Sequence, residues 1–284
     1  MPRAAAGFAE INGDLPMPAA QRIRYIARNL RRNVRAPAGP VAIRKWMLPR
    51  QALTDTGLGT ASPARYLAEA FIAHELPAIA AARRVRVLDI GCGSGRLSDL
   101  LGKAGFTGHY VGVDLQNRFA SAKWRDGAFT TEFREGDAHD LDLPSGFDLI
   151  VSNSALEHIP DDGRLIARLQ ALLAPGGLQV HVVPSACALF LYLWHGYRQY
   201  GRAAIAARFP GRPPLAYGFG GAASFLTHFM LVTVPEILFR RSLRTRLPGL
   251  YGAVLRAALR ADRLVPIMPS GYAIICRAGS EPHD

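Results

Sequence analysis

Residues 85–101 read VRVLDIGCGSGRLSDLL, and this stretch decides the fold class. The run VRVLDI (85–90) is almost continuously apolar, which predicts a buried strand. Glycines follow at positions 91, 93 and 95, and RLSDLL (96–101) begins a helical stretch. A strand, a glycine-rich turn and a helix in this order are typical of the first unit of a parallel α/β sheet.

The same rhythm continues along the chain. Further strands are expected at HYVGVD (109–114), TEFREG (131–136), FDLIVS (147–152), LQVHVV (178–183) and GYAIICRA (271–278). Helical stretches separate them at 96–103, 116–124 and 161–173, the last ending at the turn 175–177. We therefore expect an α/β fold with a doubly wound, mostly parallel sheet and helices on both faces. Ligands of such sheets bind at the carboxyl ends of the strands.

N-terminal helices precede this sheet. Residues 1 to about 20 resemble a loose tail, and QRIRYIARNLRRN (21–33) predicts a basic amphipathic helix with one apolar stripe, formed by Ile23, Ile26, Ala27 and Leu30. A loop rich in proline and glycine follows to about residue 61. Ser62 and Pro63 predict the start of a second helix, which Pro77 ends or kinks.

Residues 185–262 interrupt the rhythm with apolar, aromatic stretches of helical character. We expect a late helical insertion that forms a cap over the acceptor, although the same helices would also suit simple coverage of the sheet or a dimer contact. The predicted organisation is an N-terminal tail and basic helix (1–61), a binding core (62–184), the insertion (185–262), and the last strand with a tail (263–284).

Composition narrows the class of protein. The chain of 284 residues is long enough for a full core, and 49% apolar residues exclude a disordered chain. Neither a clean apolar run of 18 residues nor a signal-peptide core is visible, so neither a spanning helix nor a leader is expected. Cys92, Cys187 and Cys276 lie far apart, which disfavours disulfides and zinc and favours a reducing cytoplasm.

The net charge of +12 is unevenly distributed. Nine basic residues and no acid lie between Arg22 and Arg50, and no acid lies between Gly163 and Pro235. Arginines cluster again at 240, 241, 244 and 246. These segments predict either ordinary solvated surface or contact with an acidic acceptor or an anionic membrane, which would make a cytoplasmic protein peripheral to the membrane.

The glycine turn carries the chemistry. Arg96 breaks the GxGxxG dinucleotide spacing, and no GK[ST] phosphate loop is present. Acid-x-Gly-x-Gly-x-Gly after a strand resembles the first motif of class I S-adenosylmethionine-dependent methyltransferases. The resemblance implies S-adenosyl-L-methionine as cofactor, with the carboxylate of Asp89 near its cationic groups and the turn passing beneath it. The turn residues concerned are Gly91, Cys92, Gly93 and Gly95.

Four further motifs extend this resemblance over roughly residues 62–184. Asp114, followed by Leu115, ends the second strand, and a carboxylate there would accept the ribose hydroxyls. Asp137 and Ala138 would meet the adenine. Asn153 and Ser154 end the fourth strand, where the family often touches cofactor or acceptor, and LLAPGGLQV (172–180) resembles the family's turn into the fifth strand.

Signals for the acceptor are weaker. The (N/D/S)PP(Y/F) motif of base-amino methyltransferases is absent, and LEHIP (156–160) resembles quinone-biosynthesis O-methyltransferases. Ser154 stands where that subfamily has a metal-binding glutamate, so no metal is expected. His158 is the best candidate for a general base, because an imidazole titrates near neutral pH, although a structural role in the loop is the alternative.

The insertion supplies candidates for the acceptor pocket, namely Trp194, His195, Tyr197, His228 and Phe229. We therefore expect methyl transfer from S-adenosylmethionine to a small-molecule or lipid-like acceptor, with an oxygen, nitrogen or carbon acceptor atom left open. An RNA or nucleotide methyltransferase and a non-catalytic S-adenosylmethionine-binding protein are the alternatives. Nucleic acid is the less favoured partner, because no appended RNA module is recognisable.

Overall fold

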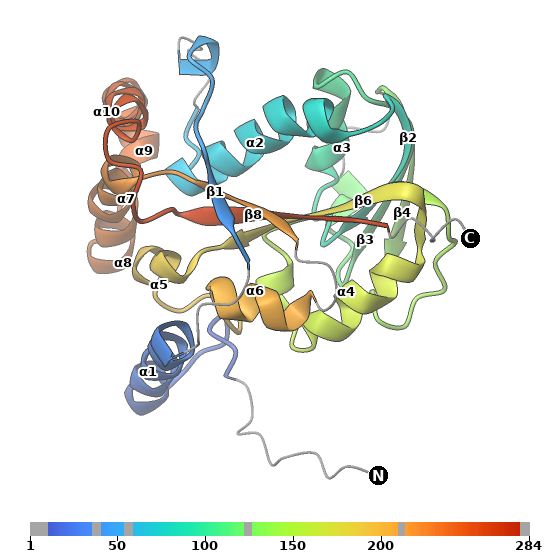
Figure 1. The fold of residues 1–284 in the computed structure, drawn as a ribbon. Helices are drawn as coiled ribbons and strands as arrows, with labels where there is room; N and C mark the ends of the chain where they lie inside the picture. Colours follow the sequence, from blue (N-terminus) through green and yellow to red (C-terminus); the bar gives the residue numbers. More distant parts are fainter. Residues whose placement is uncertain (1–10, 36–40, 54–58, 122–126, 210–213, 279–284) are drawn as a thin grey trace.

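A single eight-stranded sheet forms the centre of the protein (Figure 1). The computed structural model describes residues 11–35, 41–53, 59–121, 127–209 and 214–278. The strand order is β1-β7-β8-β6-β5-β2-β3-β4, and only β8 runs antiparallel to its neighbours. The strands are β1 (Ile43–Trp46), β2 (Arg84–Ile90), β3 (Thr107–Asp114), β4 (Phe129–Glu135), β5 (Phe147–Asn153), β6 (Leu173–Pro184), β7 (Leu215–Phe219) and β8 (Gly271–Arg277).

Helices cover both faces of the sheet, as the doubly wound fold predicts. Apolar residues of α2, α3 and α10 pack on one face and those of α4 and α6 on the other. The helices are α1 (Ala19–Arg35), α2 (Pro63–Ile79), α3 (Arg96–Lys103), α4 (Asp162–Ala171), α5 (Leu189–Tyr192), α6 (Arg202–Arg208), α7 (Ala222–His228), α8 (Val234–Leu238), α9 (Leu243–Arg246) and α10 (Pro248–Ala261). A π-helix, η5 (Phe229–Thr233), joins α7 to α8, and short 3-10 turns lie at η1 (Gln51–Leu53), η2 (Arg118–Ser121), η3 (Leu156–His158) and η4 (Ala186–Ala188).

The expected fold class is confirmed, but the sheet has two strands that the sequence pattern does not reveal. β1 lies in the segment expected to be a loop, and β7 lies in the segment expected to be helical. The two strands pair with each other in parallel, and β7 also pairs with β8 in antiparallel orientation. β1 has only four residues, IRKW, two of them exposed and basic, so it carries neither apolar alternation nor a long apolar run.

Other boundaries also differ. The expected helix at 116–124 is only the 3-10 turn η2, and residues 122–126 lie outside the described part of the chain. The turn expected at 175–177 belongs to β6, because α4 already ends at Ala171. The second helix continues past Pro77 to Ile79.

The amphipathic helix α1 is confirmed as a helix, but its apolar stripe does not face the core. Tyr25 and Asn29 are buried, whereas Ile23 is 70% exposed and Leu30 is also exposed. The hydroxyl of Tyr25 donates to the carbonyl of His195 at 2.7 Å, which anchors the helix through a polar contact. Among the described helices, none is both long and apolar enough to cross a membrane.

Candidate functional site

A cavity of about 570 Å³ opens at the carboxyl ends of the central strands. Its floor comes from the turns after β2 and β5, and α2 lies along one side. The segment that follows β6 closes it with Tyr192 of α5 and with His195. The rule that ligands bind at strand carboxyl ends therefore locates the cavity correctly. Of the residues expected to bind cofactor, those in its wall are Asp89, Gly91, Cys92, Gly93, Asn153 and Ser154.

The glycine turn is shaped for close approach. Gly93 has φ +55°, and a Cβ at this position would meet no atom within 4 Å, so the turn presents open backbone to the cavity. Gly91 has φ +71°, and a Cβ there would lie 2.5 Å from the Cβ of Ala155. The first glycine is therefore needed for packing, and the second leaves space for a ligand.

Two carboxylates flank this turn. Asp114, at the end of β3, accepts hydrogen bonds from the backbone N–H of Gly93 at 2.9 Å and of Gln116 at 3.1 Å. Asp89 is buried in the cavity wall and accepts a hydrogen bond from the hydroxyl of Tyr110. Burial raises the pKa of Asp89 to about 7, even though the Tyr110 hydrogen bond favours the ionised form. A cationic ligand beside Asp89 would restore its charge.

The remaining expected cofactor residues lie behind or beside the cavity. Gly95 packs against the ring of Phe133, and Leu115 is exposed. Asp137 is exposed and accepts a hydrogen bond from the His139 N–H at 2.8 Å. Ala138 belongs to the core on the α4 side of the sheet. Most residues of the glycine turn therefore lie in the cavity wall, whereas Asp137 and Ala138, after β4, do not.

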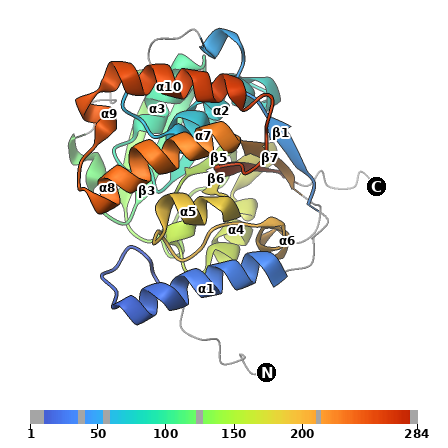
Figure 2. The ribbon, with the colours of Figure 1, turned by 90° about the vertical axis from the view of Figure 1, so that its left-hand side faces the viewer.

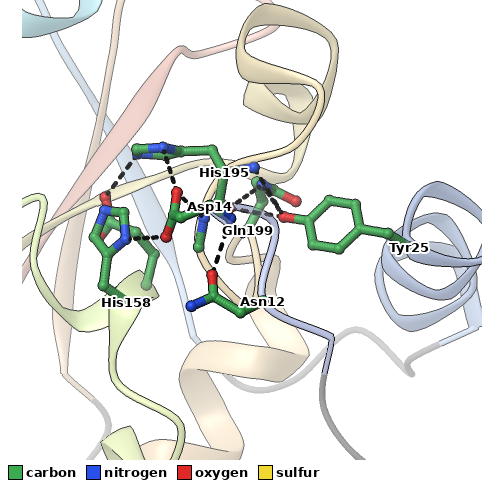
Figure 3. Close-up of polar contacts among 8 residues, drawn as sticks. Asn12, Asp14, Tyr25, His158, His195 and Gln199 are labelled. Carbon is green, nitrogen blue, oxygen red and sulfur yellow. Dashed lines mark hydrogen bonds and ion pairs between the residues drawn. The ribbon is translucent and has the colours of Figure 1, made fainter. Parts of the chain in front are cut away.

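A cluster of ionisable side chains lies at the other end of the cavity (Figure 3). His158 Nδ1 donates to Asp14 Oδ2 at 2.6 Å, and His195 Nδ1 lies 3.4 Å from Asp14 Oδ1. His195 Nε2 lies 3.8 Å from Oε1 of Glu157. Glu157 is only 1% exposed, and among the described residues neither of its carboxylate oxygens has a hydrogen-bond partner. The Gly196 N–H also donates to Asp14, at 3.0 Å.

Contacts within this cluster shift the pKa values of His195 and Asp14 so that both side chains stay charged at neutral pH. Burial alone would lower the pKa of His195, but its contacts with Asp14 and Glu157 outweigh burial and raise that pKa to about 9. Burial would raise the pKa of Asp14, but the two histidines bring it well below its usual range. At neutral pH the His195 side chain in the cavity wall is therefore an imidazolium, and it lies between the side chains of Asp14 and Glu157.

Of the candidate base and acceptor residues, one lines the cavity and the others lie behind its wall. Only His195 lines the cavity; His158 lies behind it, with ring centroids 4.6 Å apart. Trp194 lies beneath the guanidinium of Arg22, and the Tyr197 N–H donates to the carbonyl of Glu157.

The other two candidates lie deeper in the insertion. His228 packs edge-on against Tyr192, and burial lowers its pKa to about 4. Phe229 packs in a small apolar cluster with Phe225 and Leu191. The expected aromatic residues Trp194, Tyr197 and Phe229 thus pack behind the cavity wall and do not line it.

Tyr192 belongs to the aromatic stretch expected to form the acceptor pocket, and it does line the cavity. Two important residues are absent from the site expected from the sequence. Glu157 is visible as part of LEHIP, but nothing there indicates that it lines the cavity. Asp14 carries no signal, because it lies in the segment expected to be a loose tail. That expectation is wrong for residues 11–18, where the Gly13 N–H donates to the Gly196 carbonyl at 2.7 Å. Residues 1–10 lie outside the described part of the chain.

Comparisons with known proteins agree with this architecture. A family model described as a methyltransferase domain matches residues 60–211. An uncharacterized methyltransferase of Mycobacterium bovis is 36% identical over 118 residues, which are 38% of this chain and 55% of that protein. The ubiquinone biosynthesis O-methyltransferase of Bradyrhizobium sp. is 34% identical over 99 residues, which are 34% of this chain and 38% of that protein.

The family model covers strands β2–β6 of the sheet, and the chain spans about half the length or less of these relatives. A chain of the solved complex between the Haloferax volcanii methyltransferase activator Trm112 and a methyltransferase has a TM-score of 0.51 at 17% identity. The match covers 75% of this chain and 90% of that one. This likeness supports the fold.

Proposed function

Because this chain belongs to the class I S-adenosylmethionine-dependent methyltransferase family, we propose that it methylates a small molecule held in the cavity. One observation carries the proposal. A single cavity is bounded at one end by the glycine turn with Asp89, and at the other by His195 and Glu157. The groups proposed to hold the cofactor and a set of ionisable groups suited to an acceptor therefore share one cavity.

The residues of the turn fit the cofactor. Gly93 leaves open space above its backbone, and Asp89 offers a buried carboxylate to a cationic ligand. Asp114 holds the turn through Gly93 and retains lone pairs for ribose hydroxyls. When bound, S-adenosylmethionine supplies a methyl group on a sulfonium, which an aligned lone pair of the acceptor takes up directly.

We assign His195 to the acceptor. Its imidazolium would donate a hydrogen bond to the oxygen of an acceptor that enters the cavity already ionised, and would hold that oxygen in place as the nucleophile. Asp14 fixes the ring through Nδ1, and Glu157 lies near its other nitrogen. His158, the base expected from the sequence, takes a supporting role in this proposal, because it contacts Asp14 and His195 and is absent from the cavity wall.

An isotope-transfer experiment tests the function. The purified protein is incubated with S-adenosylmethionine that carries a deuterated methyl group and with a small-molecule extract or total RNA, and mass spectrometry detects labelled products. We expect one labelled small molecule with the native protein, and much less of it with Asp114→Ala when the cofactor is kept below saturation. Labelled RNA would support the nucleotide alternative instead. Cofactor binding without any labelled product would indicate a non-catalytic binding protein.

A further inference from the structure

In helix α1 polar side chains face the protein and large apolar side chains face the solvent. Its buried side is polar, with Tyr25 1% and Asn29 2% exposed. Its solvent side carries Ile23 and Leu30 together with exposed arginines such as Arg24. Exposing large apolar side chains on a well-anchored helix is unfavourable in water, so this side is suited to a partner that accepts both apolar groups and cations.

The same composition recurs on the helices that follow β6. Phe239, just after α8, is 64% exposed. The other exposed large apolar residues of this region are Phe190 on α5, Leu226 on α7, Met230 on η5, Ile237 on α8, and Leu247, Leu250 and Val254 at and within α10. Together with the solvent side of α1, we call this surface the helical face.

These elements lie on one side of the molecule. In Figure 1 they occupy the left-hand edge, and in Figure 2, turned toward that edge, α1, α5 and α7–α10 all lie in front of the sheet. α5 lies between α1 and α7 in this view, which connects the two groups. The helices that carry these side chains therefore lie on one side of the protein.

The charge of the helical face is almost wholly positive. α1 contains six arginines and no acid, and residues 222–261 contain six arginines and one acid, Glu236. Glu236 forms an ion pair with Arg244 at 2.8 Å, so it does not offset the remaining cations. Arg240, Arg241 and Arg246 are exposed. Apolar side chains interspersed with arginines complement an anionic lipid surface, where the apolar groups enter the interface and the arginines meet the headgroups.

We propose that the helical face docks the protein on the surface of an anionic bilayer. The face is also connected to the cavity: Tyr25 of α1 donates to the carbonyl of His195, and Tyr192 of α5 lines the wall. A docked protein would therefore hold its cavity near the membrane surface. The proposal rests on the exposed side chains and their charge, and it stands whether or not the methyl acceptor is a lipid.

Co-sedimentation with vesicles tests the proposal. The full chain is mixed with phosphatidylcholine vesicles that contain either none or a quarter of phosphatidylglycerol, at low and at high salt. We expect binding to the anionic vesicles only, weakened by salt. Arg240→Gln/Arg241→Gln should weaken binding by about 25-fold, at roughly fivefold per arginine near an anionic surface. Ile23→Ser/Leu30→Ser should weaken it by about tenfold or more.

Matched controls separate docking from net charge and from folding. Arg84→Gln/Arg164→Gln removes two exposed arginines from β2 and α4, outside the helical face, and should bind like the native protein. Circular dichroism and cofactor binding should match the native protein in all variants. Absence of binding to anionic vesicles, or equal weakening by the control pair, would overturn the proposal. So would a dimer in solution that the Ile23/Leu30 variant dissociates, because the face would then bind a second copy.

Discussion

Asp14 accepts a hydrogen bond of 2.6 Å from His158, although the two residues lie 144 positions apart in the chain. The same carboxylate contacts His195, which lines the cavity. The segment that precedes α1 is therefore part of the site, and it lies more than 60 residues before the glycine turn. Its carboxylate is what keeps a histidine in the cavity wall positively charged.

We predict that Asp14→Asn lowers the pKa of His195 from about 9, because it removes the negative charge next to Nδ1. Titration of the imidazole by NMR measures this change, and the exposed Asp142→Asn should leave it unaltered. A raised histidine pKa stabilises the fold most below pH 6.5, and this contribution is lost as pH rises through 9. The variant's deficit in stability should therefore shrink over that range; a constant deficit would contradict the prediction.

Asp114→Ala should weaken S-adenosylmethionine binding by about tenfold or more, since each hydrogen bond to a charged group contributes roughly 1.5–3 kcal/mol. The carboxylate also holds the Gly93 N–H at 2.9 Å, so its loss frees the turn as well as the ribose contact. Isothermal titration calorimetry gives the affinity. Unchanged affinity in a folded variant would remove Asp114 from the cofactor site.

Cofactor affinity should depend on pH through Asp89. The pKa of this carboxyl is about 7 without ligand, and a cationic ligand binds its ionised form. At pH 6 about one molecule in ten has Asp89 ionised, so binding should be about tenfold weaker than at pH 8. Asp89→Asn should bind weakly with a nearly flat profile between these pH values. A flat profile in the native protein would show that Asp89 does not face the cationic groups.

Asp162→Ala should destabilise the fold strongly without altering the cavity wall. The buried Asp162 pairs with Arg198 at 2.9 Å and with Arg208, and it accepts a hydrogen bond from Tyr200 at 2.7 Å. Removing it leaves Arg198, which is 1% exposed, without its buried counter-charge, at a cost of about 3–5 kcal/mol. Chemical denaturation measures this loss, and Asp161→Ala, at the exposed cap of α4, should cost about 1 kcal/mol.

The sequence alone was sufficient for the class of fold and for expecting a cavity at the carboxyl ends of the strands. Local patterns carry both: apolar runs of strand length alternate with helices, and the glycine turn follows Asp89 directly. The glycine turn follows β2 directly, and Asp114 ends β3, one βαβ unit later. Because β2 and β3 pair in parallel, the turn and this carboxylate end up next to each other.

Only the tertiary structure decided which side chains meet at the far end of the cavity, where we propose that the acceptor binds. Asp14, Glu157 and His195 come from three distant segments, and no periodicity brings them together. The short strand β1 pairs with β7, a partner about 170 residues away that no pattern in its own four residues indicates. Which stripe of α1 is buried was likewise set by a long-range contact, the hydrogen bond from Tyr25 to His195, and this contact leaves Ile23 and Leu30 facing solvent.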